Sequence, residues 1–331
     1  MKNATFRQLQ IFAASAKRLS FSRVAEELHL TPAAVSFQIR QLETAGGFPL
    51  FERYGKRVRL TEAGHLLLGF AEAALKAMHD ANEAFASLKN PEVGEIRVGL
   101  ISTAKYVVPH IIARFRAVHP GAMVRLVDGN RREILALIDG GAVDLAIIGR
   151  PPNAAQIEAL AFADHPYVIV APPDHPLARQ PGLSLADLAA EDFILREDGS
   201  GSRLLIEGLF DAAGLKPSVS MTTSSNETIK QAVMAGMGLA GISRHTVGLE
   251  LGLGLLKVLD VQGSPWMRTW FVAHRRSTPL IPLHASLKSF ILCEGRGAVA
   301  AMEKAQAETI GSPAQLPPDL GRAASQAGCD R

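Results

Sequence analysis

A Thr-Pro pair at positions 31 and 32 restricts the fold of this chain more than any other feature. Threonine is a favoured N-cap and proline is favoured at the first helical position, so the pair marks the start of a helix. The helix runs AAVSFQIRQLET, and its apolar side chains recur at helical spacing: Val35, Ile39 and Leu42. A shorter helix capped by Ser20 or Ser22 precedes it. Two short helices with a tight connection predict a helix-turn-helix unit, whose second helix enters the major groove of DNA.

The remaining surface of the predicted second helix suits contact with DNA. Small and polar residues near its start let the backbone approach base edges. We expect this part of the interface to comprise Thr31, Pro32, Ala33, Ser36, Phe37 and Gln38. The segment FERYGKRVRL that follows predicts a hairpin, or wing, with its turn at Tyr54-Gly55-Lys56. We expect phosphate contacts from Arg40, Arg53, Lys56 and Arg57, with Arg59 beside them.

Charge along the chain supports this reading. The whole chain carries a formal net charge of only +3. Residues 1–60 contain ten basic and four acidic side chains, so the positive charge is concentrated in the predicted head. A small basic module on a near-neutral body is typical of nucleic-acid binders, although chance clustering on a solvated surface produces the same count. A three-helix bundle without DNA would not need the polar helix face or the basic hairpin.

Residues 62–88 predict one long alanine-rich helix. Its apolar positions form a stripe: Leu66, Leu67, Phe70, Ala74, Ala77, Ala81, Ala84, Phe85 and Leu88. A helix of this length cannot bury such a stripe on the small head alone, so we expect a partner helix from a second subunit. Packing on the chain's own C-terminal domain is the alternative.

From residue 91 onward, short β-like runs alternate with helical stretches. Strands are expected at GEIRVGLIS, AMVRLVDG, VDLAIIGR, PYVIVAPP, DFILRED, SVSMTTSSN and WMRTWFVAHR, with helices between most of them. This pattern predicts two doubly wound α/β subdomains. The expected organisation is a winged helix-turn-helix head (1–61), a linker helix (62–90), a ligand-binding domain (91–295) and a disordered tail (296–331). The two subdomains are expected at 91–163 with 266–295, and at 164–265.

Ligands of such sheets bind beyond the carboxyl ends of the strands and at helix N-termini. That rule selects hydroxyl, amide and guanidinium groups, which suit an anionic ligand. Plain helix capping is the alternative role for the serine, threonine and asparagine side chains. The selected positions are Ser102, Thr103, Asn130, Arg150, Ser200, Ser202, Arg203 and Asn226.

The head resembles the signature of LysR-type transcriptional regulators. The matching motifs are Val24-Ala25, Thr31 to Ser36, Gln38-Ile39, Leu42-Glu43, Leu50 to Arg53 and Leu60 to Gly64. Gly46-Gly47 departs from the usual Leu-Gly at the helix end. The resemblance implies a bacterial regulator that binds an operator in double-stranded DNA as a dimer of dimers and acts with RNA polymerase. It also implies an antiparallel linker-helix pair and a periplasmic-binding-protein-like effector domain without a cofactor.

Within that family, DLAIIGRPP, REDGSGSR and ISRHTVGLELGLGLLKVLDVQG resemble regulators of Calvin-cycle carbon-fixation operons, the CbbR type. The resemblance covers residues 1–295. It implies effectors such as ribulose bisphosphate and other sugar phosphates, phosphoenolpyruvate, ATP or NADPH. A LysR-type regulator of another metabolic operon is the alternative.

Two other classes of protein fit the sequence less well. An enzyme is disfavoured because there is no G-x-S-x-G or H-E-x-x-H motif and the histidines are scattered. A solute-binding transport protein should begin with a secretion signal and lack the basic head. The N-terminal residues contain no signal-peptide core, no apolar run is long enough to span a membrane, and Cys293 and Cys329 suggest no disulfide framework. We therefore expect a cytoplasmic protein.

Overall fold

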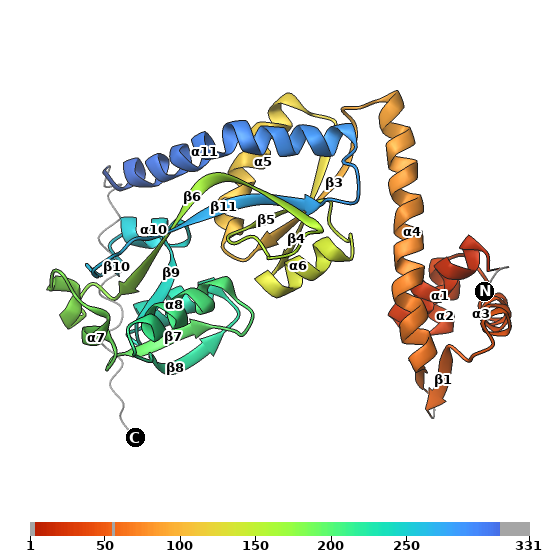
Figure 1. Ribbon diagram of the computed structural model, residues 1–331, viewed down its shortest axis with the longest axis horizontal. Coiled ribbons are helices and arrows are strands. Elements are labelled where there is room, and N and C mark those ends of the chain that lie inside the picture. The colour runs from red at the N-terminus through yellow and green to blue at the C-terminus, as the bar shows by residue number, and fades with distance from the viewer. Residues whose placement is uncertain (1–3, 55–56, 312–331) are drawn as a thin grey trace, which may run out of the picture.

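The computed structural model describes residues 4–54 and 57–311, which form a small head, a long helix and a two-lobed α/β domain (Figure 1). The head contains α1 (Phe6–Arg18), α2 (Phe21–Glu27), α3 (Pro32–Gly46), β1 (Phe51–Tyr54) and β2 (Arg57–Leu60). Its core is formed by fully buried side chains from all three helices: Ile11, Phe12, Val24, Val35 and Leu42. Burial of these residues orients the opposite surface of α3 towards solvent.

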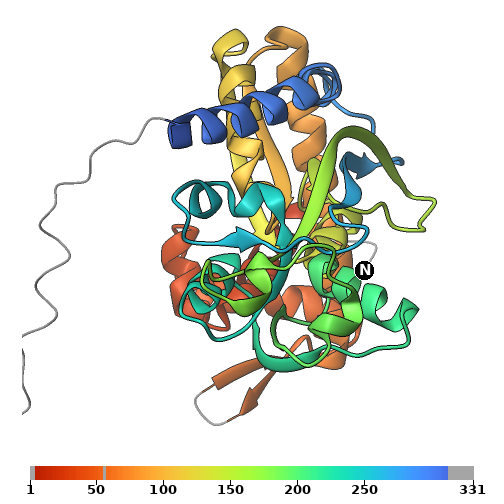
Figure 2. The same ribbon diagram turned by 90° about the vertical axis from the view of Figure 1, so that its left-hand side faces the viewer.

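The hairpin and the long helix are both anchored to the head. Strands β1 and β2 pair antiparallel and extend away from the helices, which is clearest in Figure 2. Helix α4 (Glu62–Lys89) starts directly after β2. Gly64 lies so close to the Leu50 carbonyl oxygen that any side chain at position 64 would collide with it. Ala71 is buried against the head core, so the first half of α4 is part of the head's packing.

The second half of α4 contacts the α/β domain through charged side chains. Lys76 forms an ion pair of 2.8 Å with Asp80 on the next helical turn. The Lys76 ammonium also lies 3.9 Å from Asp144, and Asp80 lies 3.6 Å from Arg97. Arg97 and Asp144 are themselves joined at 2.7 Å. An ionic cluster therefore joins the linker helix to the edge of the first lobe.

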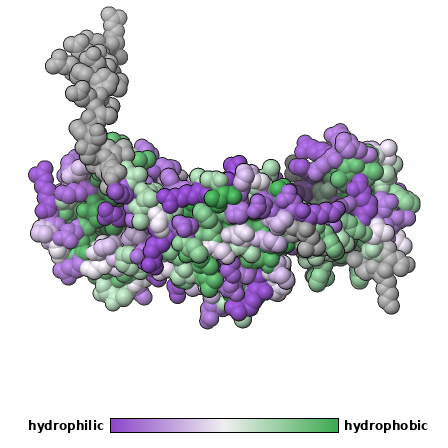
Figure 3. All heavy atoms as spheres, turned by 90° about the horizontal axis from the view of Figure 1, so that it is seen from above, coloured by the Kyte–Doolittle hydropathy of each residue, from purple (hydrophilic) through white to green (hydrophobic). Residues whose placement is uncertain are grey.

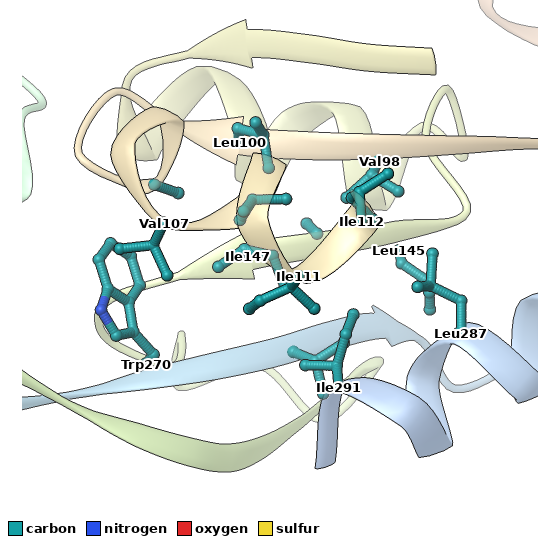
Figure 4. Packing of buried hydrophobic residues seen from close by; sticks show 14 of the residues in the cluster. Val98, Leu100, Val107, Ile111, Ile112, Leu145, Ile147, Trp270, Leu287 and Ile291 are labelled. Atoms are coloured by element: carbon teal, nitrogen blue, oxygen red, sulfur yellow. The ribbon is translucent and has the colours of Figure 1, made fainter. Parts of the chain in front are cut away.

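The first lobe is built on three parallel strands, β3 (Gly94–Ile101) between β4 (Ala122–Gly129) and β5 (Leu145–Ile148). Helices α5 (Val108–Val118) and α11 (Pro282–Gly311) cover one face, and α6 (Arg131–Asp139) covers the other (Figure 1). Branched aliphatic side chains of the sheet interlock with those of α5 and α11 (Figure 4). This packing fixes where the carboxyl ends of β3 and β5 lie.

Two long antiparallel strands, β6 (Ile157–Ala171) and β11 (Trp266–Arg275), run from the first lobe into the second. Strand β11 pairs with β5 in the first lobe, and β6 pairs with β9 (Ala240–Ser243) in the second. The sequence-based boundary at 163/164 thus falls inside a continuous strand. Strands β6 and β11 therefore form a connection that both lobes share.

The second lobe repeats the α/β pattern on a smaller scale. Strands β7 (Asp192–Arg196) and β8 (Ser218–Thr223) are parallel, and β7 is bridged to the segment before β9 at Phe193 and Leu239. The other elements are α7 (Leu185–Leu188), α8 (Gly201–Ala212), α9 (Asn226–Met234), α10 (Gly248–Gly252) and β10 (Lys257–Val258), with 3-10 turns η1 (Ala104–Tyr106), η2 (Pro176–Arg179) and η3 (Arg244–Thr246). The expected winged head, linker helix and two-lobed α/β architecture is confirmed.

The tail expected to be disordered from residue 296 is helical as far as Gly311, so that expectation is wrong for residues 296–311. Ala298, Val299 and Met302 are buried and belong to the first lobe's core. The sequence did not indicate this helix because these three apolar residues lie among alanine, glycine and charged residues, a composition that suggested disorder. Residues 312–331 lie outside the described part of the chain. No helix among the described residues has the length and apolarity needed to cross a bilayer.

Candidate nucleic-acid interface and ligand cleft

Helix α3 is held by its cap and by its buried face. The Thr31 hydroxyl accepts a hydrogen bond of 3.1 Å from the Ala34 amide, and Pro32 occupies the first turn. Val35, Ile39 and Leu42 face the head core. The cap therefore uses the Thr31 hydroxyl, and the side chains opposite the buried face of the helix are directed to solvent.

Exposed and half-buried side chains are arranged in order across the solvent-facing surface of α3. Ala33, Phe37 and Arg40 are exposed, whereas Ser36 and Gln38 lie half-buried on its two flanks. Phe37 is 50% exposed, which is high for a phenylalanine in a folded head. The structure thus brings the sequence-predicted residues of α3 onto one accessible surface.

The hairpin contains the other residues that the sequence predicts to contact phosphates. Arg53 stands opposite Val58 in the β1–β2 register, and Arg57 stands opposite Tyr54. Lys56 lies outside the described residues. The space-filling view in Figure 3 shows hydrophilic and hydrophobic residues mixed over both the head and the α/β domain. Phosphate contact by these basic residues stays a prediction.

A cleft between the lobes encloses about 50 Å³ at the carboxyl ends of β3 and β5. Six of the eight side chains predicted from the sequence line it: Ser102, Thr103, Asn130, Arg150, Ser200 and Ser202. The sequence analysis missed three further polar lining residues: Arg131, Tyr167 and Arg268. Arg131 directly follows the predicted Asn130, so the strand-end rule could have found it. Tyr167 and Arg268 lie within the crossing strands and not at their carboxyl ends, so that rule gives no signal for them.

Several lining groups already have structural partners. Asn130 caps α6 by accepting from the Glu133 amide at 3.0 Å. The Ser200 hydroxyl caps α8, and the Tyr167 hydroxyl lies 3.2 Å from that of Ser202. These bonds fix the shape of the cleft, so the capping role considered for these residues from the sequence holds for Asn130 and Ser200.

The guanidinium groups make the cleft cationic. Arg131, Arg150 and Arg268 line it, and no aspartate or glutamate stands among its described lining residues. Burial lowers the pKa of Arg131, and the nearby Arg150 lowers it further. The Nε of Arg131 is buried without a hydrogen-bond partner among the described residues. A buried, unpaired donor beside other cations favours an anion as the missing partner.

Arg203 and Asn226 do not line this cleft. Arg203 pairs with Asp198 at 3.0 Å and with Glu207 at 2.7 Å on the surface of α8. The Asn226 side chain instead accepts a hydrogen bond of 2.7 Å from Arg196, a buried guanidinium that the sequence analysis did not single out. Contact of either residue with a ligand stays a prediction.

Arg196 closes the lobes on one side of the cleft. It reaches from β7 to donate to the Ser102 hydroxyl at 2.7 Å, and the Asn226 amide donates to the Ser102 carbonyl at 3.3 Å. Glu197 balances its charge at 2.8 Å. The end of β3 is thereby tied to the second lobe by charge-assisted hydrogen bonds.

A buried ring stack supports the floor of the cleft. His165 of β6 lies 3.7 Å from the Trp270 ring of β11, and its Nε2 lies 3.0 Å from the Ser243 hydroxyl. Trp270 donates to His245, whose other nitrogen lies 3.0 Å from Glu303 of α11. The stack joins both crossing strands to the helical extension found beyond residue 296.

Two family models match this chain. The model of the bacterial regulatory helix-turn-helix protein, lysR family, matches residues 6–65, and that of the LysR substrate binding domain matches residues 89–296. The transcriptional regulator CfxR of Cupriavidus necator is 47% identical over 292 residues, covering 88% of this chain and 92% of the relative. A RuBisCO operon transcriptional regulator of Allochromatium vinosum is 42% identical over 292 residues, with coverage of 88% and 97%.

Two solved structures have a fold similar to that of this chain. The regulatory domain of CcmR from Synechocystis PCC6803, in complex with 2-PG, is 34% identical, with a TM-score of 0.58 over 60% of this chain and 96% of that one. Full-length CbnR complexed with its target DNA gives a TM-score of 0.69 over 88% of this chain and 99% of that one. At 22% identity, the likeness to CbnR shows the fold alone.

The histidine stack predicts a stability that depends on pH. Burial lowers the pKa of His165 well below the ordinary 6.5, and the nearby His245 and Arg268 lower it further. Below pH 6.5 the unfolded chain therefore binds a proton that the folded domain does not. The free energy of unfolding should fall by up to about 1.4 kcal/mol per pH unit from this residue as pH decreases towards 5.

Urea unfolding followed by tryptophan fluorescence measures this, because both tryptophans, Trp266 and Trp270, lie on β11. His165→Gln should reduce the slope with pH, whereas the matched change at exposed His110 should leave it unaltered. An equal slope in the wild type and His165→Gln would show that His165 does not stay neutral in the folded domain.

Proposed function

Because the chain belongs to the LysR family of DNA-binding transcriptional regulators, we propose that it controls operons for Calvin-cycle carbon fixation in response to a small anionic metabolite. The near-full-length likeness to a RuBisCO operon regulator supports the choice of operon. The arginine-lined cleft between the lobes is the observation that carries the choice of effector class.

The three guanidinium groups that line the cleft favour an anionic effector. A short phosphate ester with a carboxylate, such as 2-phosphoglycolate or phosphoenolpyruvate, would place its charges near Arg131, Arg150 and Arg268. The CcmR domain in complex with 2-PG supports the same class.

The geometry suggests how the effector acts. Binding between the lobes changes the angle at the β6–β11 crossing. Strand β3 carries that change towards α4, because Arg97 near its start is paired with Asp144 and Asp80. The effector shifts the population between two arrangements of the oligomer and relaxes a bend in the bound DNA.

A thermal-shift screen tests the effector. We expect a rise in the melting temperature with 2-phosphoglycolate, phosphoenolpyruvate, ribulose bisphosphate or NADPH, because a ligand of the native state stabilises it by mass action. Arg268→Gln should weaken that ligand's affinity about 10- to 100-fold through loss of a charge-assisted hydrogen bond. Arg116→Gln, on the exposed surface of α5, is the control and should leave affinity unchanged.

Shikimate and aromatic acids form the other arm of the screen. A shift with those ligands alone would exclude the carbon-fixation assignment and leave a LysR regulator of another operon. Unaltered phosphate-ester affinity in Arg268→Gln would exclude the cleft as the effector site.

We further propose that α4 pairs with α4 of a second copy of the chain in a homo-oligomer. Leu66 and Phe70 are more than two-thirds exposed, and Phe85 is 71% exposed on the same side of the helix. Small residues between them, Ala74 and Ala77, are exposed too and allow close approach of a second helix.

Phe70→Glu should disrupt this pairing, because it places a charge in an apolar helix contact. Sedimentation velocity should show dissociation to smaller species at concentrations where the wild type stays assembled. The same glutamate at His65, which is exposed on another side of α4, should leave the assembly intact. A Phe70→Glu protein that sediments like the wild type would show that the stripe does not join subunits.

A further inference from the structure

The solvent-facing surface of α3 contains an apolar side chain that the head does not use. Phe37 is 50% exposed and belongs to no part of the described head core. It stands at the centre of the exposed stripe, opposite buried Val35, Ile39 and Leu42. Each large apolar group left in water forgoes the stabilisation that burial would give.

The surroundings of Phe37 are polar. A shallow concavity at this point is lined by Phe37, Arg40, Gln41 and Thr44 of α3, together with Thr5 and Gln8 at the start of α1. Scattered exposed apolar residues are common and need no explanation by themselves. Phe48 is such a residue: it is 66% exposed but follows the end of α3 and lies outside this concavity. Phe37 differs because it lies on the helix that enters the major groove.

The chemistry of the major groove limits what a phenylalanine can recognise there. The edges of guanine, adenine and cytosine present hydrogen-bond donors and acceptors, which a benzyl group cannot satisfy. Thymine alone presents an apolar group, its C5 methyl. The neighbouring Arg40 and Gln41 can meet phosphates or polar base edges, so the ring needs only one apolar partner.

We propose that Phe37 contacts the C5 methyl of a thymine in each operator half-site and thereby selects thymine over cytosine at that position. This inference rests on DNA binding by the head and does not depend on which operon or effector the regulator serves. It is therefore tested separately from the carbon-fixation assignment.

The test replaces single thymines by uracil, which removes the methyl group and leaves the hydrogen-bonding edge intact. The probe is a duplex that the full-length wild-type protein selects from a randomised pool. We expect one sensitive thymine in each half-site. Uracil at a single one of them should weaken binding about four-fold, which corresponds to about 0.8 kcal/mol for one buried methyl group. Phe37→Ala should bind the thymine and uracil duplexes equally, because the group that contacts the methyl is gone.

Two further variants keep the result interpretable. Phe37→Leu retains an apolar side chain and should retain part of the preference for thymine. Phe48→Ala removes the other exposed phenylalanine and should retain all of it. In the wild type, 5-methylcytosine at the sensitive position should bind more tightly than cytosine, since it restores a methyl at the same place in the groove.

Two results would overturn the proposal. One is a wild-type protein that is indifferent to uracil at every thymine of the selected duplex. The other is a uracil effect that is equally large in Phe37→Ala, which would assign the methyl contact to a different residue. If Phe37→Ala lost its helical circular dichroism, the Phe37→Leu comparison would decide.

Discussion

The pairing of β6 with β11 is the interaction on which the rest of the α/β domain depends. These two strands are the long elements shared by both lobes, and their register is continuous from Trp266 opposite Tyr167 to Arg275 opposite Ile157, with one irregularity after Trp270. Tyr167 and Arg268 of this pair line the cleft. His165 and Trp270 of the same two strands stack on each other. The strands that connect the two lobes therefore also form part of the candidate ligand cleft.

Strand β3 connects the cleft to the linker helix of the DNA-binding head. Its carboxyl end leads to Ser102, which Arg196 of the second lobe contacts directly. Its amino end carries Arg97, which pairs with Asp144 of its own lobe and with Asp80 of the linker helix. Burial opposes ionisation of Asp144, but the hydrogen bonds and charge of Arg97 together with the nearby His284 outweigh burial and lower its pKa, so the pair stays charged. Four residues of β3, 98–101, thus separate the linker contact at Arg97 from Ser102 at the cleft.

The sequence predicted local features well and long-range contacts poorly. The cap at Thr31-Pro32 and the alternation of strands and helices depend on neighbouring residues, so the head and most strand-end residues of the cleft could be found. Arg196 ends β7, so the strand-end rule could have found it. Arg268 lies within β11, and only the pairing of β11 with β6 brings it to the cleft. The helix beyond residue 296 was missed because its stability comes from packing Val299 and Met302 on a distant core.

We propose that an anion held between the lobes changes the shape of the DNA bound by the heads. Bending an operator by 40–90° costs roughly 1–6 kcal/mol, which is within what a ligand that prefers one arrangement can supply. The most direct measurement is the bend angle of a bound operator, from circularly permuted fragments, with and without saturating 2-phosphoglycolate. A smaller angle with the ligand is predicted. An angle that stays the same while the ligand is bound would show that the anion does not control the bend.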